Sequence, residues 1–394
     1  MAKRILVVRA TPTDLDINAY NVQQVGLGKA FVDMGYDYDF VTLKKDGKNC
    51  KTMVFYENNG CKARCIEKPR HRFLRWGINT EICKKEFLNQ YDLVICQEYY
   101  QLQSYLVARN SKNVALYSGP YYNLFLPKWF SPLYDCLIGP KLNKLVRVKF
   151  VKSVLAENFL EKKGYTGLYN IGVGLDTERF TDVEITPDIQ KLVDYMKTNE
   201  CMLYVGALSD RKNYPFMLDL YQRLLSERPN LKFVVIGKSR MSFWYKFFGK
   251  KDRDYEASFE SRITKEAMQG IYRVERIANP QLKFVYPVAK AFILPSKLEI
   301  FGMVLLEAMF LGSPVVSSSN GGSMSLIHNN GKYGQVVDEF DVEKWSKAVI
   351  RYLVNQEYAR TVSKNAKELI EKQFNWDAIS RNMIYILKNN GYEI

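Results

Sequence analysis

The chain alternates short apolar runs with amphipathic stretches along its 394 residues. In the first half, we predict strands at RILVV (4–8), YDFVTL (38–43), DLVICQ (92–97) and NVALYSG (113–119). The stretch 20–35 repeats apolar residues at helical spacing and ends on glycine, so we predict a helix there. This β-α-β rhythm is typical of a parallel, doubly wound sheet.

The same rhythm restarts in the second half, after a polar interval near 181–200. We predict strands at 201–206, 231–237, 291–296 and 313–319, and helices at 214–229, 342–355 and 359–374. The stretch 44–91 is Lys-rich and irregular and indicates no element clearly. We therefore expect an α/β protein with two Rossmann-like domains whose parallel sheets face a central cleft. The expected boundaries are 1–178, 179–375 and a C-terminal helix, 376–394, that returns to the first domain.

The most informative segment is 292–314, FILPSKLEIFGMVLLEAMFLGSP. Its apolar start predicts a strand, and a helix is expected from about Met303 to the stop signal at Gly312. Free backbone N–H groups and the helix dipole make such a helix start a binding place for anions. Glu299 and Glu307 flank the turn, and carboxylates accept hydrogen bonds from hydroxyl groups. The segment therefore predicts a ligand with both phosphate and hydroxyl groups, as in a nucleotide-sugar.

The net charge of +15 comes from 57 Lys and Arg against 42 Asp and Glu. Such an excess favours an acidic partner: a nucleic acid, an anionic membrane or a phosphorylated substrate. The alternative is a generally basic proteome or a contribution to solubility alone. No nucleic-acid-binding module is recognisable, so we expect no nucleic acid. Hydrophobic residues at 47% and charged residues at 25% are ordinary for a soluble globular protein.

Metal chemistry finds no support in the sequence. The seven cysteines form no CxxC pair and the chain has two histidines, His71 and His328, which we expect at the surface. The odd cysteine count and apolar surroundings favour reduced structural thiols. The apolar run at the start, Ile5 to Val8, is too short for a secretory signal, and no run has the roughly 18 apolar residues of a membrane helix.

Several segments together resemble the retaining family 4 glycosyltransferases of the GT-B fold, a group 1 family. The signature lies in PSKLEIFGMVLLEAM (295–309) and in GSPVVSSSNGG (312–322). YVGALSDRKNYPFMLDLYQRLL (204–225) resembles the phosphate-binding loop and the helix that follows it. NNGKYGQVVDEFDVEKWSKAV (329–349) resembles the segment after the donor site, and NIGVGLDTERF (170–180) the segment that links the domains.

The resemblance implies a role for each matching residue. Glu307 is expected on the ribose hydroxyls of the nucleotide and Glu299 near the hydroxyls of the donor sugar. Arg211 and Lys212 are expected to bind the diphosphate and to stabilise it as the leaving group. Backbone N–H groups beside the diphosphate and the turn around them complete the implied nucleotide site: Gly206, Phe301, Gly302, Met303 and Val304. Each charged residue also has an ordinary interpretation as a solvated surface charge.

The chain departs from the family pattern at four places. Ala207 stands where many relatives have an arginine, and Arg211 is expected to replace that charge. The segment 10–21 has no glycine pair after the first strand, and Ser118-Gly119-Pro120 has no histidine. Ser325 replaces an acidic residue. These departures concern the acceptor and the donor sugar, and they leave the two glutamates intact.

The implied function is retaining transfer of a hexose-type sugar from a nucleotide-sugar, a UDP- or GDP-sugar, without a metal or bound cofactor. The implied acceptor is a saccharide or a polyprenyl- or lipid-linked sugar in cell-surface polysaccharide or glycolipid synthesis. It would bind the domain 1–178, and the donor the domain 179–375. The alternatives are a GT-B epimerase or glycogen-synthase-like enzyme, and a catalytically silent partner or membrane-docking subunit.

Two segments, 124–152 and 238–251, mix cations with large apolar side chains. Aromatic rings among lysines suit the surface of an anionic membrane, where each basic residue contributes about 1 kcal/mol. The alternative is that Trp129, Phe130 and Leu133 belong to the core and that 238–251 is a loop. We expect a cytoplasmic protein that contacts the inner membrane face peripherally.

Overall fold

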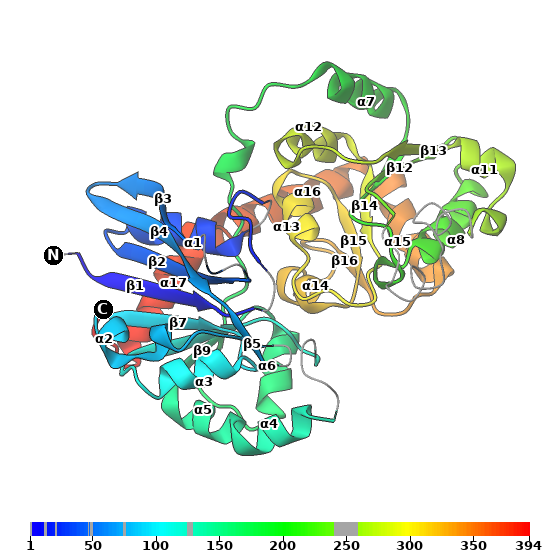
Figure 1. Cartoon of the computed structure of the whole chain (residues 1–394). Coiled ribbons are helices and arrows are strands. Elements are labelled where there is room, and N and C mark those ends of the chain that lie inside the picture. The colour runs from blue at the N-terminus through cyan, green and yellow to red at the C-terminus, as the bar shows by residue number, and fades with distance from the viewer. Residues whose placement is uncertain are drawn as a thin grey trace. The chain divides into compact units, whose positions relative to one another are not determined.

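The structure, a computed structural model, describes residues 2–11, 14–19, 22–45, 47, 50–73, 76–123, 129–239 and 259–394. The chain divides into two compact units (Figure 1). Unit 1 comprises Met1–Asp176 and Gln373–Ile394, and unit 2 comprises Thr177–Lys372. Parts of both basic aromatic segments, 124–128 and 240–251, lie outside the described residues.

Unit 1 is built on an eight-stranded sheet with the order β10-β9-β8-β7-β1-β2-β4-β3. All its neighbouring strands are parallel except β3 and β4. The inner strands are buried along their length, as expected when helices cover both faces of a parallel sheet. The strands are β1 (Arg4–Arg9), β2 (Asp37–Lys44), β3 (Thr52–Asn58), β4 (Cys61–Pro69), β7 (Leu93–Gln97), β8 (Val114–Ser118), β9 (Val148–Val151) and β10 (Leu168–Asn170).

A short second sheet pairs β5 (His71–Phe73) with β6 (Trp76–Ile78). The helices of unit 1 are α1 (Gln23–Asp33), η2 (Glu81–Cys83), α2 (Lys85–Leu88), α3 (Leu102–Ala108), α4 (Ser131–Leu137), α5 (Gly139–Leu145), α6 (Val154–Glu161) and α17 (Trp376–Asn389). The last of these, α17, lies beside α1 although it ends the chain (Figure 1). Trp376 fits against Gly26 and Gly174, where a β-carbon would collide with its ring. The C-terminal helix therefore returns to unit 1.

Unit 2 contains a six-stranded, wholly parallel sheet with the order β13-β12-β11-β14-β15-β16. The strands are β11 (Cys201–Val205), β12 (Lys232–Ile236), β13 (Ile271–Val274), β14 (Ala291–Leu294), β15 (Val315–Ser318) and β16 (Gln335–Val337). The α-helices are α7 (Pro187–Thr198), α8 (Tyr214–Leu225), α11 (Lys265–Gln269), α12 (Leu282–Val285), α13 (Met303–Phe310), α14 (Gly321–Leu326), α15 (Val342–Val354) and α16 (Gln356–Gln373). Short 3-10 turns occur at η3 (Glu178–Phe180), η4 (Asp210–Lys212), η5 (Glu260–Arg262), η6 (Asn279–Gln281) and η7 (Tyr286–Val288). The wholly parallel sheet of unit 2 and the mainly parallel sheet of unit 1 confirm the predicted α/β fold class.

The sequence pattern missed two features. The irregular stretch 44–91 contains the antiparallel pair β3 and β4, whose inward positions are held by small residues such as Ala63 and Cys65 while cations face outward. This alternation lowers the apolar content and hides the strands. The polar interval near 181–200 contains α7, which begins at Pro187 and buries one apolar face.

Surface positions agree with the sequence for some residues and differ for others. His71 and His328 are exposed, as expected. Cys136 is exposed, unlike the buried thiols that the sequence suggested, and every cysteine is free. Among the described residues, none of the helices combines the length and the apolarity needed to cross a bilayer.

Candidate functional site

The predicted site residues gather at one edge of the sheet of unit 2. Strands β11 and β14 are parallel neighbours, so their carboxyl ends meet at the same edge. After β11 the chain turns through η4, which carries Arg211 and Lys212. After β14 it forms the loop 295–302, which carries Glu299. The structure thus brings together charges that are almost ninety residues apart in the sequence.

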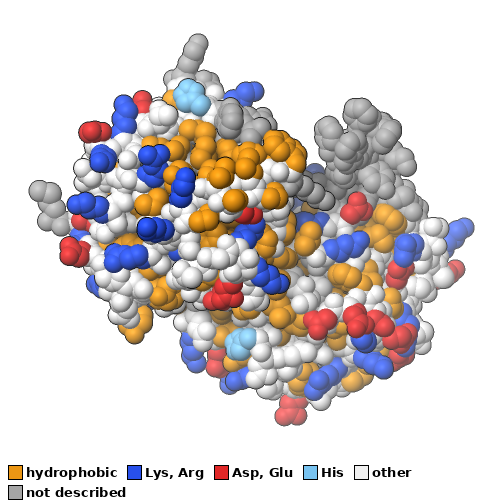
Figure 2. Space-filling view, turned by 90° about the horizontal axis from the view of Figure 1, so that it is seen from below, with side chains coloured by type: hydrophobic (Ala, Val, Ile, Leu, Met, Phe, Trp, Pro, Cys, Tyr) orange, Lys and Arg blue, Asp and Glu red, His pale blue; other side chains and the backbone are white. Residues whose placement is uncertain are grey.

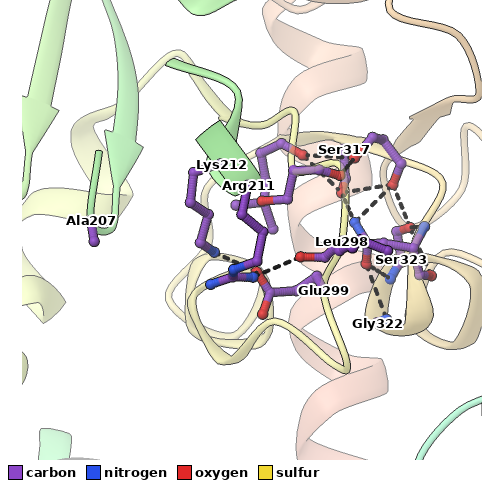
Figure 3. A network of polar contacts seen from close by, with 12 residues as sticks. Ala207, Arg211, Lys212, Leu298, Glu299, Ser317, Gly322 and Ser323 are labelled. Atoms are coloured by element: carbon purple, nitrogen blue, oxygen red, sulfur yellow. Dashed lines mark hydrogen bonds and ion pairs between the residues drawn. The ribbon is translucent and has the colours of Figure 1, made fainter. Parts of the chain in front are cut away.

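Glu299 receives both cations on one carboxylate oxygen (Figure 3). The Lys212 Nζ lies 2.5 Å and the Arg211 Nη1 2.9 Å from Glu299 Oε2. The Lys212 and Glu299 side chains are 8% and 14% exposed, whereas that of Arg211 is 47% exposed. Ion pairs removed from water interact more strongly than surface pairs. The Lys212–Glu299 pair is therefore the electrostatic centre of this edge.

Backbone hydrogen bonds join the same two loops. The Lys297 N–H donates to the Arg211 carbonyl at 2.9 Å, and the Arg211 guanidinium donates to the Leu298 carbonyl at 2.6 Å. These bonds hold the loop that carries the carboxylate against the turn that carries the cations. The charged contacts consequently rest on a fixed backbone and do not depend on long side chains alone.

Helix α13 begins where the sequence predicted, directly after Gly302. Gly302 has a left-handed backbone with φ +77°, a conformation that glycine adopts without a steric cost. The turn places the N–H groups of Met303 and Val304 at the helix start, where no earlier turn of the helix can accept them. Glu307 lies one turn into α13 with its side chain buried, and Phe301 before the helix is buried as well.

A second helix start closes on the same loop. The Gly321 N–H, at the beginning of α14, donates to the Glu299 carbonyl at 3.1 Å. A β-carbon at Gly321 would collide with the Ile300 carbonyl oxygen, and one at Gly322 with that of Phe301. The glycine pair is therefore required because two backbones approach closely here.

Serine and asparagine side chains fix α14 in place, a network that the sequence analysis did not identify. Asn320 caps α14 by accepting from the N–H groups of Gly322 and Ser323, and the Ser323 hydroxyl accepts from the Asn320 N–H. Ser323 also donates to the Ser318 carbonyl at 2.6 Å, and Asn320 donates to the Ser317 hydroxyl (Figure 3). The Asn-x-x-Ser spacing was the available signal, because it is a form of the capping box.

Burial lowers the pKa of Lys212, and the nearby Glu299 carboxylate opposes this effect by favouring the charged ammonium. The remaining influence is Arg211, whose positive charge lowers the pKa further. Burial thus makes the charged form of Lys212 less favourable than it would be in water. Additional negative charge beside it would stabilise the ammonium.

Two further predicted positions lie at the end of β11. Gly206 follows the strand directly, and its carbonyl is so close to Gly237 that a β-carbon there would collide with it. Ala207 lies apart from the cluster of Arg211, Lys212 and Glu299 (Figure 3). The cationic charge at this edge therefore comes from η4 and not from the position after the strand.

Other places in unit 2 are less suited to this chemistry. A cavity of about 490 Å³ is lined by Lys290, Gly312 and Pro314, which precede β14 and β15, so it lies at the opposite edge of the sheet. Throughout the described part of the chain, no three His, Cys, Asp or Glu side chains gather closely enough to hold a metal ion.

Comparison with known proteins shows which family unit 2 resembles. Residues 190–369 match the family model of the group 1 glycosyl transferases. The matched segment contains Arg211, Lys212, Glu299 and Glu307. Unit 2 is therefore similar to the group 1 glycosyl transferases over these residues, and the likeness to solved structures shows that the fold of the chain is GT-B.

Similarity to individual proteins extends over much of the chain. An uncharacterized glycosyltransferase of Methanocaldococcus jannaschii is 22% identical over 92% of both chains. The O-antigen chain mannosyltransferase B of Escherichia coli is 29% identical over 47% of this chain and 45% of its own, so the match spans less than half of that relative. The structure of Anabaena HepE in complex with UDP and glucose superposes with a TM-score of 0.66 at 16% identity, covering 98% of this chain and all of that one.

We predict that the Lys212→Met variant keeps or raises the stability of the fold. Its Glu299 retains the bond to Arg211, so no buried charge is left alone, and the unfavourable burial of the ammonium is removed. The unfolded state holds the Lys212 proton up to pH 10.5, while the folded state releases it at lower pH. In that window the free energy of unfolding of the wild type rises with pH, and the variant loses this contribution.

Calorimetric melting at several pH values measures both effects. A change at pH 7 below about 1 kcal/mol, equivalent to ~2–4 °C for a unit of this size, agrees with the prediction. A much larger loss of stability in Lys212→Met would contradict the prediction, because it would show that the ion pair stabilises the fold.

Proposed function

We propose that the protein is a retaining glycosyltransferase that transfers a hexose-type sugar from a nucleotide-sugar to a saccharide or lipid-linked acceptor. The observation that carries this proposal is the convergence of Arg211 and Lys212 on Glu299 beside the start of α13. This edge combines cations, the N–H groups at a helix start and carboxylates, which are the groups that a sugar diphosphate requires. Unit 2 would hold the donor and unit 1 the acceptor.

The donor would bind along the edge in a defined order. Glu307, buried in α13, would accept hydrogen bonds from the ribose hydroxyls, because a carboxylate can accept two from a vicinal diol. The N–H groups of Gly302, Met303 and Val304 would meet the diphosphate. Glu299 would meet hydroxyls of the donor sugar. The donor nucleotide is proposed to be UDP or GDP, and the structure of HepE in complex with UDP supports UDP.

Transfer would break the bond between the anomeric carbon and the diphosphate oxygen. The bonding electrons pass to the phosphate, and Lys212 and Arg211 would stabilise the charge that develops there. The acceptor hydroxyl would bond to the same face of the anomeric carbon and release its proton to a phosphate oxygen. The configuration is then retained without an enzymic nucleophile, and the two cations would supply the charge that a metal ion supplies elsewhere.

The setting proposed for this reaction is the synthesis of cell-surface polysaccharide or glycolipid. The similarity to a mannosyltransferase of the O-antigen chain supports this setting. A silent GT-B partner remains the second candidate, because Ala207 and the first-unit departures remove family landmarks. The two candidates are distinguished by turnover, because an active transferase would need the charged edge for catalysis and a silent partner would show no turnover.

We predict that Lys212→Met and Glu299→Gln each reduce turnover by at least about a hundredfold, since each removes a group that would contact the reacting diphosphate or sugar. Release of nucleoside diphosphate from UDP- and GDP-sugars measures the effect. Lys265→Met is the matched control, because Lys265 is an exposed lysine of unit 2 at the start of α11, and its turnover should stay within about twofold. Unchanged turnover in both site variants would refute the roles of Lys212 and Glu299.

A stripe on unit 1 supports contact with an anionic membrane. Large apolar side chains are exposed on and before α4 and α5: Trp129 at 73%, Leu133 at 49% and Leu137 at 52%, followed by Leu145 at 42%. Lys141 and Lys144 are exposed on the same stretch. We call these six residues the α4–α5 stripe. Figure 2 shows hydrophobic side chains gathered on this face of unit 1, which is the lower face in Figure 1.

The charge and spacing of the stripe suit a lipid surface. Leu133 and Leu137 are four residues apart in α4, and Lys141 and Leu145 are four residues apart in α5, so each pair lies on one side of its helix. The single acid within 129–145, Asp135, pairs with Lys163 and leaves the lysines uncompensated. Exposed aromatic and aliphatic groups beside lysines are typical of interfacial helices. The protein would thus reach a lipid-linked acceptor at the membrane that carries it.

We predict that the double variant Leu133→Glu/Leu137→Glu no longer sediments with phosphatidylglycerol vesicles, whereas the wild type does at low salt and less at high salt. Val354→Glu is the control, since Val354 is 63% exposed on unit 2. Light scattering on the same samples measures the molar mass and so tests whether a second copy of the chain covers the α4–α5 stripe instead. A stable dimer that the double variant disrupts, or no vesicle binding by the wild type, would contradict the membrane contact.

A further inference from the structure

The sheet of unit 1 has a topological switch point between β1 and β7. From β1 the chain builds the sheet towards β2 and β4, and it then returns to β7 on the other side and continues to β8, β9 and β10. Open parallel sheets bind ligands outside the carboxyl ends of the strands that flank such a point. Arg9 ends β1, and Gln97 ends β7. The residues at the ends of β1 and β7 are therefore positioned to contact a ligand.

Glu98, directly after β7, is the centre of a buried charged cluster at this edge. Its Oε1 lies 3.3 Å from the Lys152 Nζ, and its Oε2 accepts from the Ser118 hydroxyl and the Gly119 N–H at 3.1 Å each. The two charged side chains are about nine-tenths buried. Lys152 follows β9 and also lies over the ring of Tyr117. The cluster thus combines the ends of three adjacent strands, β7, β8 and β9.

The backbone at Glu98 is strained. Its φ of +70° is left-handed, a conformation that residues with a side chain rarely adopt. Such strain persists where the surrounding structure enforces it, and it concentrates at functional sites. The Glu98 carbonyl accepts from the Ser104 hydroxyl at 3.0 Å, and the Glu98 N–H donates to the Tyr117 carbonyl. The turn therefore aims the carboxylate at Lys152 at the strand ends.

Arg9 adds a second cation on the other side of the switch point. Its guanidinium is half-buried, and burial lowers its pKa while Tyr100 and Glu98 favour its charge. The Arg9 Nη1 is buried and has no hydrogen-bond partner among the described residues. Glu98, in contrast, already receives three donors. The cluster consequently carries two cations against one satisfied carboxylate, which leaves hydrogen-bonding capacity on a cation.

We infer that this edge of unit 1 binds an anionic oxygen group of the acceptor, a phosphate ester, through Arg9 with Lys152 beside it, while Glu98 positions Lys152. The inference deepens the proposed function and rests on it, because it states what kind of acceptor unit 1 takes. A planar guanidinium suits phosphate, which it can contact with two parallel hydrogen bonds. The phosphate belongs either to a soluble sugar phosphate or to the diphosphate of a lipid carrier.

Calorimetric titration with inorganic phosphate, glucose 6-phosphate and farnesyl diphosphate tests the inference. The protein carries Lys212→Met, so that unit 2 contributes little to binding of phosphate. We expect at least one probe to bind, and Arg9→Gln to weaken it by about tenfold or more, since a charged hydrogen bond is lost. Tighter binding of glucose 6-phosphate indicates a soluble acceptor, and tighter binding of farnesyl diphosphate a lipid-linked one.

Two further variants keep the test decisive. Arg9→Lys retains the charge and should recover part of the affinity if Arg9→Gln folds poorly. Arg109→Gln is the control, because Arg109 is an exposed arginine of unit 1 just after α3, and its affinity should stay within about twofold. Equal affinity in Arg9→Gln and Arg109→Gln, or no binding of any probe, overturns the inference. Arg9-dependent binding, together with a wild type that turns over no nucleotide-sugar, would instead defeat the proposed function and leave the anion site standing.

Discussion

The contact between Lys212 and Glu299 ties together the two turns that form the charged edge of unit 2. One turn follows β11 and the other follows β14, and the register of these parallel strands brings their ends together. The pair is largely withdrawn from water, and Arg211 completes it from the more exposed side. Because burial opposes the Lys212 charge, the pair is poised to accept another anion. The pair lies between the loop 295–302 and the η4 turn, beside the start of α13, so an anion bound there would meet both the cations and the helix N–H groups.

Close backbone packing is the second constraint on the same edge. The α14 start approaches the loop that carries Glu299, which only glycine at 321 and 322 permits. Asn320 and Ser323 satisfy the N–H groups that this close approach would otherwise leave unpaired. The carboxylate is thus held by rigid elements on both sides, as preorganised electrostatic stabilisation of a leaving group requires.

The spacing of Glu299, Gly302 and Glu307 was readable from the sequence because all three belong to one local strand–turn–helix segment. Arg211 and Lys212 were found because the loop that carries them, after the strand that ends at Val205, resembles the phosphate-binding loop of the family. The bond from Lys212 to Glu299 was not readable, since it depends on β14 being the neighbour of β11 in a sheet whose strand order does not follow the chain. The cluster around Glu98 was not predicted for the same reason, because it joins the ends of strands that become neighbours only in the folded sheet. The left-handed backbone of Glu98 could not be predicted either, since its neighbours in the sequence include no glycine or other turn residue.

Titration of UDP and GDP into the wild type and into Lys212→Met tests the central claim, that the charged edge of unit 2 binds the diphosphate of the donor. The account predicts that one of the two nucleotides binds the wild type, raises its melting temperature and binds Lys212→Met at least about tenfold more weakly. Lys265→Met should bind like the wild type. Binding of neither nucleotide, or equal affinity in Lys212→Met and the wild type, would contradict the account.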